Sequence, residues 1–191
     1  MNITIRRFLS YLIDMLIVFI FVMFINALLP NKFDNEIKNL NQQLYEQKID
    51  NSTYFELYKP LLHEHDKQDL MLNICTTILL ISFFVLVPYC TNGQTIGQKI
   101  FKLKMIANDD DTFLLDDLIA RSVILNGIGY MVFMFVIIYL VNDNIYFILI
   151  NLLAFLQITV VIINGFMILY NHKNLSITDK FTNTRIVRIK K

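Results

Sequence analysis

The chain has 191 residues, a formal net charge of +1, a hydrophobic content of 55% and a mean hydropathy of +0.52. This length suits one domain, 1–191, and the near-neutral charge gives no signal for nucleic-acid binding. Apolar residues gather in four blocks, each meeting the roughly 20 residues that span a bilayer: 8–29, 70–89, 122–141 and 145–170. The blocks are apolar on all faces, which argues against a soluble bundle because too little chain remains to cover them. We predict an all-α membrane fold with four transmembrane helices.

Lys and Arg residues cluster on one predicted side of the membrane. They occur at the N-terminus, in the loop 90–117 and in the tail 171–191, whereas the loop 30–69 has an acidic excess. The positive-inside rule therefore places both termini, the 90–117 loop and the tail in the cytoplasm, and the 30–69 loop outside.

The predicted outer loop, 30–69, contains two stretches with apolar residues at helical spacing. They predict an extracytoplasmic hairpin of two amphipathic helices around a break at 50–52. The His-Glu-His-Asp run at 63–66 has metal-binding residue types, but residues two apart face different ways on a helix, and HExxH spacing is absent. We expect a solvated loop there and no metal site.

Two short segments on the cytoplasmic side, 102–106 and 184–190, alternate polar and apolar residues like β-strands. We predict that they pair into a small basic ribbon packed under the helices, because an isolated two-stranded ribbon is weak. The Thr95-x-x-Gln98 pattern predicts the start of a short helix. The segment 113–120 is amphipathic and suits the membrane interface.

Asp14 is the most informative residue, because a carboxylate inside an apolar span is costly unless it is paired, hydrated or protonated. Arg7 lies about two turns earlier on the same helical face. Arg121, Asn126 and Asn164 fall near the same end of their blocks, so one polar cluster can form. Two hypotheses follow. Asp14 either makes a structural salt bridge to Arg7, Arg121 or the tail, or exchanges a proton for a cation.

The sequence lacks the motifs of common enzymes: a Gly-rich phosphate loop, a nucleophile elbow and a zinc constellation. Cys75 and Cys90 fall on one predicted helix, too far apart to bridge, and are expected to be free thiols. We therefore expect neither catalysis nor a cofactor.

Three segments occur in order along the chain: RFLSYLID at 7–14, NGQTIGQKIFKLK at 92–104 and LSITDKFTNTRIV at 175–187. Together they resemble the signatures of the RDD family of prokaryotic membrane proteins, which is named for an Arg and two Asp residues. The resemblance makes Asp179 the second Asp, for which a helix cap, a salt bridge to an Arg and a functional role all remain open. The chain departs from the family at Lys102, where Gly is common, and at 182–183, where a small pair often contains Gly.

The resemblance implies a multi-pass protein of a prokaryotic cell membrane, and transport, including cation/proton antiport, has been suggested for some members. We expect transport of a small solute or cation. Coupling of this transport to protons is one form of the hypothesis. The charge cluster that would support it is Arg7, Asp14, Arg121, Asn164 and Asp179.

The alternative is a non-catalytic scaffold or accessory protein that binds a partner through the loop 30–69. Expected partners are the lipid bilayer, a cation or proton, and either a second copy of the chain or another membrane protein, since four helices are few for a secondary transporter.

Overall fold

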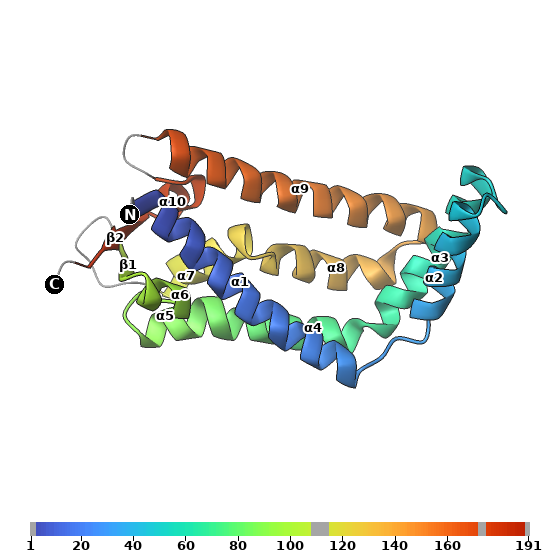
Figure 1. Ribbon diagram of the computed structural model, residues 1–191, viewed down its shortest axis with the longest axis horizontal. Coiled ribbons are helices and arrows are strands. Elements are labelled where there is room, and N and C mark those ends of the chain that lie inside the picture. The colour runs from blue at the N-terminus through green and yellow to red at the C-terminus, as the bar shows by residue number, and fades with distance from the viewer. Residues whose placement is uncertain (1–2, 108–114, 172–174, 190–191) are drawn as a thin grey trace.

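The computed structural model describes residues 3–107, 115–171 and 175–189, which form an elongated helical bundle (Figure 1). Three helical runs are long and apolar enough to cross a membrane: Ile3–Leu28, Leu70–Cys90 and Asp143–Tyr170. The first is α1 and the third is α9. The second joins α4 (Leu70–Ile81), a π-helical turn η1 (Ser82–Leu86) and α5 (Val87–Cys90). The predicted membrane fold is confirmed.

The predicted third span is bent and not one continuous helix. The helices α7 (Leu115–Leu125) and α8 (Ile128–Leu140) meet at 69°, and only together are they long and apolar enough to form a fourth span. Gly127 turns the chain there with a φ of +79°, in the left-handed region that glycine tolerates. The Gln157 amide donates to the freed carbonyls of Ile124 and Leu125, at 3.4 and 3.3 Å. At membrane depth, the backbone carbonyls that a break in a helix leaves free need hydrogen bonds of this kind.

The outer surfaces of the spans carry large exposed apolar side chains, as expected where lipid tails replace water. On α1 and α9 they include Phe8, Phe19, Phe24, Phe155 and Phe166. The buried core is small and lies between the helices, with one cluster around Phe83 and Phe84 and a second around Ile138 and Tyr146. Since lipid is as apolar as these side chains, polar contacts must contribute to holding the helices together.

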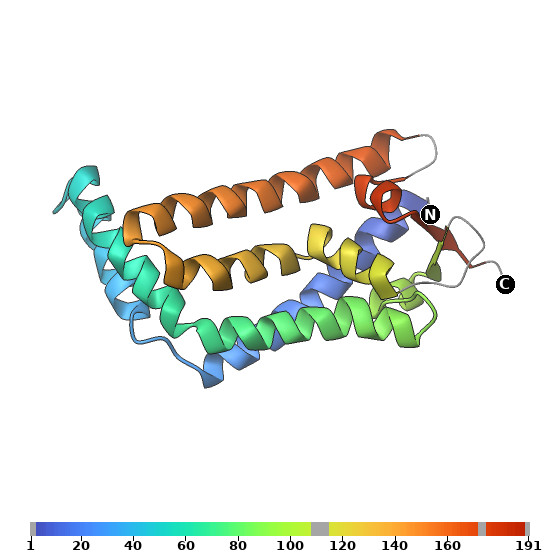
Figure 2. The same cartoon turned by 180° about the vertical axis from the view of Figure 1, so that it is seen from behind.

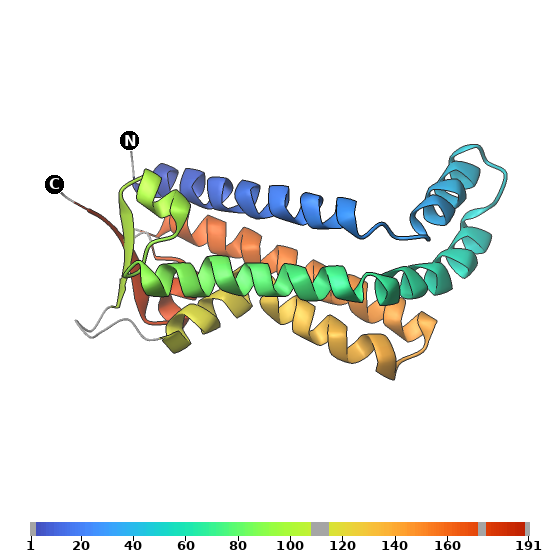
Figure 3. The same ribbon diagram turned by 90° about the horizontal axis from the view of Figure 1, so that it is seen from below.

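The predicted hairpin exists and lies at one end of the bundle, here called the hairpin end (Figure 1). It consists of α2 (Asp34–Tyr45) and α3 (Asn51–Gln68). Asp50 caps α3, because its carboxylate accepts a hydrogen bond from the Thr53 N–H at 3.2 Å. The predicted break at 50–52 lies slightly earlier, at 46–50, because residues 51 and 52 already belong to α3. Figure 3 shows α2 and α3 turning away from the direction of the spans.

The expectation of a solvated loop at 63–66 is wrong, because these residues belong to α3 and His63 is only 2% exposed. The His63 ring nitrogens lie 2.6 Å from the Asp143 carboxylate and 2.7 Å from the Ile138 carbonyl, and the ring stacks on Tyr146. His63 thus ties the hairpin to α8 and α9. Within the described ranges, no group of three His, Cys, Asp or Glu side chains is arranged to hold a metal ion.

His65 joins the two helices of the hairpin. Its ring nitrogens contact Asp66 at 3.2 Å and Asp34, at the start of α2, at 3.1 Å. The hydrogen bond to Asp66 raises the pKa of His65 to about 9; burial opposes the rise, and Asp34 and Asp69 add to it. A protonated His65 therefore links α2 to the end of α3 at neutral pH.

The opposite end of the bundle, here called the ribbon end, carries both termini (Figure 2). It holds α6 (Ile96–Ile100), β1 (Leu103–Ala107), α10 (Ile177–Phe181) and β2 (Thr184–Arg188). The strands pair antiparallel with Met105 opposite Ile186, so the predicted ribbon is confirmed. It packs on the helices through Met105, which joins Val85 and Leu118 in a buried cluster.

Two residues before the strands have the backbone conformation that glycine favours. Lys102 has a φ of +55° and Asn183 a φ of +45°. Lys102 and the pair 182–183 are the places where this chain departs from the glycines common in the family that it resembles. The chain therefore keeps the turn geometry with a Lys and an Asn, at a cost that glycine would not have. Part of the predicted amphipathic segment, 113–114, lies outside the described residues, and the rest belongs to α7.

Candidate functional site

Asp179 binds two arginines at the ribbon end. Its Oδ2 accepts a hydrogen bond from Arg7 Nη2 at 2.6 Å, and its Oδ1 accepts one from Arg121 Nη1 at 2.5 Å. Asp179 is fully buried, and the two arginines are at most 8% exposed. These three side chains, here called the Asp179 lock, join α1, α7 and α10. A charge-assisted contact of this kind is among the stronger hydrogen bonds in proteins.

The sequence around Asp179 places it in the lock through a capping box. The Ser176 hydroxyl accepts from the Asp179 N–H at 3.0 Å, and the Asp179 carboxylate accepts from the Ser176 N–H at 2.9 Å. Burial alone would raise the pKa of Asp179, but the positive charges of Arg121 and Arg7 and the Ser176 N–H hold it well below its usual range. Asp179 is therefore ionised. Asp179 therefore has both structural roles that were predicted as alternatives, a helix cap and a salt-bridge partner.

Asn164 of α9 secures the same short helix. Its side-chain oxygen accepts from the Thr178 N–H at 3.1 Å and from the Thr178 hydroxyl at 2.9 Å. The tail is thus bonded to α1 and α7 through Asp179 and to α9 through Thr178. This explains how a helix of only five residues holds a fixed position under the bundle.

Asp14 lies deeper on α1 and has different partners. Its Oδ2 accepts from the Thr95 hydroxyl at 2.6 Å, and its Oδ1 accepts from the Gly97 N–H at 2.7 Å. Both donors belong to the start of α6, whose predicted capping box of Thr95 and Gln98 is confirmed. Asp14 is 2% exposed, and among the described residues no Lys or Arg nitrogen lies within 4.0 Å of it. The expected salt bridge from Asp14 to Arg7 or Arg121 is therefore wrong; Asp179 takes that place.

The Asp14 contact requires a glycine at position 97. A Cβ added to Gly97 would lie 2.2 Å from the Ser10 carbonyl oxygen and 3.0 Å from the Asp14 carboxyl carbon. Such distances are impossible without movement of the backbone. Gly97 therefore lets α6 approach α1 closely enough for its N–H to reach Asp14.

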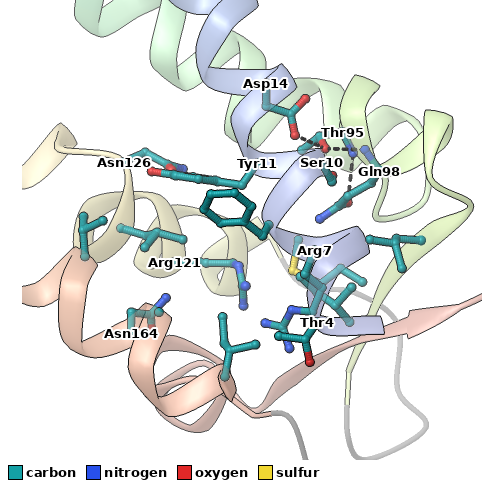
Figure 4. Close-up of a pocket in the computed structure, with 18 of the residues that line it drawn as sticks. Thr4, Arg7, Ser10, Tyr11, Asp14, Thr95, Gln98, Arg121, Asn126 and Asn164 are labelled. Atoms are coloured by element: carbon teal, nitrogen blue, oxygen red, sulfur yellow. Dashed lines mark hydrogen bonds between the residues drawn. The ribbon is translucent and has the colours of Figure 1, made fainter. Parts of the chain in front are cut away.

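A cavity of about 660 Å³ lies between these two polar groups, α7 and α9 (Figure 4). Its polar lining comes from several elements and consists of Thr4, Arg7, Ser10, Tyr11, Asp14, Thr95, Gln98, Arg121, Ser122, Asn126 and Asn164. Asn126 Oδ1 is buried and, among the described residues, accepts no hydrogen bond. Most of the remaining wall is apolar. The volume falls within the range of roughly 300–1,000 Å³ typical of small-molecule sites.

The structure therefore brings Arg7, Asp14, Arg121 and Asn164 to the wall of one cavity, with Asp179 bound to the two arginines, but these residues form two separate groups. In one group Arg7 and Arg121 bind Asp179 and Asn164 binds the adjacent Thr178, and in the other Asp14 binds the start of α6. Sequence reasoning missed the donors Thr95 and Gly97. Their signal was available, because the capping box that starts α6 exposes N–H groups that attract a carboxylate.

The chain is similar to a known protein family over most of its length. The sequence profile of the RDD family matches residues 4–183. No curated protein and no solved structure matches the chain. The match extends from the beginning of α1 to the residue before β2, and so includes Arg7, Asp14 and Asp179. This multi-pass, largely helical membrane protein belongs to the RDD family.

Proposed function

We propose that the chain is a carrier for a small solute or cation, and that Asp14 takes up and releases a proton during each transport cycle. It would lie in the cytoplasmic membrane of a prokaryotic cell. Its ribbon end would face the cytoplasm, because Lys and Arg residues are concentrated there. The hairpin would then face outward.

One observation supports this proposal most strongly: Asp14 is a buried carboxyl group in a membrane span without a cationic partner among the described residues. A structural ion pair would explain a carboxylate in such a place, but the ion pairing is done by Asp179. A carboxyl group that is not neutralised by a fixed cation can be neutralised by a proton or a mobile cation. Those are the two states that an exchanger needs.

The surroundings of Asp14 suit a site for small charged species. Ser10, Tyr11 and Thr95 line the same cavity as the carboxyl group, and the Thr95 hydroxyl binds it directly. Hydroxyl and carboxylate oxygens are suitable ligands for hard cations. Since four spans are few for a carrier, we also propose that the working unit contains more than one copy of the chain.

Proton flux in liposomes tests the proposal. Purified protein with a trapped pH dye would be exposed to gradients of Na⁺, K⁺ and Li⁺. We expect cation-dependent proton flux with the wild-type protein and at least about a tenfold loss in Asp14→Asn, because the amide keeps the shape but cannot carry the proton. Asp116→Asn is the matched control, since Asp116 is an exposed carboxylate on α7.

Two outcomes would count against the carrier. Wild-type protein that is folded and inserted, yet gives no flux above that of empty liposomes, would rule out proton exchange with these cations. Equal flux in wild type and Asp14→Asn would remove Asp14 from the pathway.

A second candidate function is a membrane scaffold, favoured by a groove between α2 and α3. The groove has a volume of about 520 Å³ and combines apolar residues such as Leu40 and Leu57 with Glu36 and Glu64 at its edge. A scaffold would tolerate Asp14→Asn but fail when residues 35–67 are replaced by a short linker. A carrier would respond to Asp14→Asn in the way described above.

A further inference from the structure

Gly165 of α9 lines the cavity and is not used for close helix packing. Small residues in membrane helices usually allow two backbones to approach each other. A Cβ added at Gly165, however, would meet no heavy atom within 4 Å among the described residues. By contrast, a Cβ at Gly97 would collide with the Ser10 backbone oxygen. The absence of a side chain at Gly165 therefore adds to the space of the cavity.

The cavity opens sideways toward the lipid. Several of its wall residues on α1 and α9 are also strongly exposed on the surface of the spans: Ile5, Phe8, Ile162, Phe166 and Leu169. They are apolar, and their exposure is between 51% and 66%. Because α1 and α9 are both membrane-spanning, surface exposure at these positions means contact with bilayer lipid. The mouth is thus an apolar entrance between two helices, near the ribbon end.

The inner wall of the cavity is polar and has a cationic side. Arg7 and Arg121 both line it, and both bind the carboxylate of Asp179, which does not itself belong to the lining. Asp14 lies about 10 Å farther along α1, and both its oxygens are bonded toward α6 and not toward the arginines. The surrounding ribbon end adds further described Lys and Arg residues: Arg6, Lys99, Lys102, Lys104, Lys180, Arg185 and Arg188. Such a surface attracts anionic lipid headgroups.

We propose that the cavity binds one anionic phospholipid of the bilayer. Its phosphate would lie at the cationic side near Arg121, and one acyl chain would run through the mouth beside Gly165. Guanidinium groups suit phosphate because they offer several donors in a planar fork. A lipid would contact the polar inner wall with its phosphate and the apolar mouth with its acyl chain, whereas free phosphate would contact only the polar wall. The proposal does not depend on transport, because a lipid can occupy this place whether or not the protein exchanges protons.

Lipid retention by the full-length protein tests this inference. Detergent-purified protein would be titrated with phosphatidylglycerol, with phosphatidylcholine of the same chains and with inorganic phosphate, and bound species would be counted by native mass spectrometry. We expect one phosphatidylglycerol to remain bound, in preference to phosphatidylcholine. Inorganic phosphate at the same concentration should not displace it. Displacement by phosphate alone would overturn the assignment to a lipid.

Substitutions at Gly165 localise the binding. Gly165→Phe should fill the mouth and weaken phosphatidylglycerol binding at least about tenfold, or 1.4 kcal/mol. Gly165→Ala should bind as the wild type does. Ile158→Phe is the matched control for added bulk on α9, because Ile158 is 59% exposed and does not line the cavity. Equal lipid binding by all four proteins would overturn the proposal.

Two further readouts distinguish lipid binding from an interface between copies of the chain and from proton exchange. If Gly165→Phe dissociated an oligomer and left lipid binding unchanged, Gly165 would belong to an interface between copies and the lipid proposal would fail. Loss of lipid binding with Asp14-dependent proton flux intact would support the lipid site and leave the carrier proposal standing. Absence of flux in wild type would not affect the lipid measurement.

Discussion

Asp179→Asn is expected to destabilise the folded protein by about 3–5 kcal/mol, the usual cost of removing one partner from a buried ion pair. Asparagine keeps the size of the side chain but leaves Arg7 and Arg121 without the carboxylate that both of them bind. It also weakens the capping box that positions α10. Thermal unfolding of the protein in detergent, followed by circular dichroism, measures the change. Asp116→Asn, an exposed carboxylate on α7, is the control and should unfold as the wild type does.

The same lock predicts how stability depends on pH. The pKa of Asp179 is lower in the folded state than the unfolded value of about 3.9. Its contribution is therefore complete above about pH 4 and is lost as the pH falls below that value. Wild-type protein should lose stability in this range more steeply than Asp179→Asn. Parallel curves for the two proteins, or equal unfolding temperatures at pH 7, would contradict the role of Asp179 as the lock.

Gly97→Ala is expected to separate α6 from α1, at a cost of about 3 kcal/mol, the upper end of what overpacking usually costs. The reason is that the added methyl group would meet a backbone oxygen, which cannot move as a flexible side chain can. Movement of α6 would carry both Thr95 and the Gly97 N–H away from Asp14. The variant should therefore lose stability and proton flux together. Unfolding temperature and liposome flux, measured on the same preparation, check both effects.

Gly165→Ala provides the matched control for Gly97→Ala. The two substitutions add the same methyl group to a helix, but the methyl group at position 165 meets no atom within 4 Å among the described residues. It should be neutral, or stabilising by up to about 1 kcal/mol, because glycine inside a helix is less favourable than alanine. If both variants behaved alike, close packing at Gly97 would not be the cause.

The features that could be predicted from the sequence depend on local patterns. Long apolar blocks predict spans, alternation predicts the ribbon, and the Thr95 pattern predicts the start of α6. The bend at Asn126 and Gly127 was missed although Asn-Gly is a recognised turn signal, because the apolar residues on both sides read as one span. The length and hydropathy of an apolar block therefore do not show whether the span is straight.

The pairing of the charges could not be predicted in the same way. Arg7 and Asp14 share one face of α1, so spacing alone made them natural partners. The structure instead gives each of them a partner from a different capping box: Arg7 binds Asp179 of α10, and Asp14 binds the start of α6. Both partners reach α1 only through the tertiary fold. His63 shows the same limit, since its burial depends on the ends of α8 and α9, far away in the sequence.

Infrared difference spectroscopy of the protein in lipid tests proton exchange at Asp14 without an intermediate step, because it observes the carboxyl group itself. Spectra would be recorded at fixed pH before and after addition of Na⁺, K⁺ or Li⁺, for wild type, Asp14→Asn and Asp116→Asn. We expect a cation to remove the C=O band of a protonated carboxyl group in wild type and in Asp116→Asn, and we expect no such change in Asp14→Asn. A folded wild-type protein whose carboxyl band does not respond to any of the cations, or a response that persists in Asp14→Asn, would contradict exchange at Asp14.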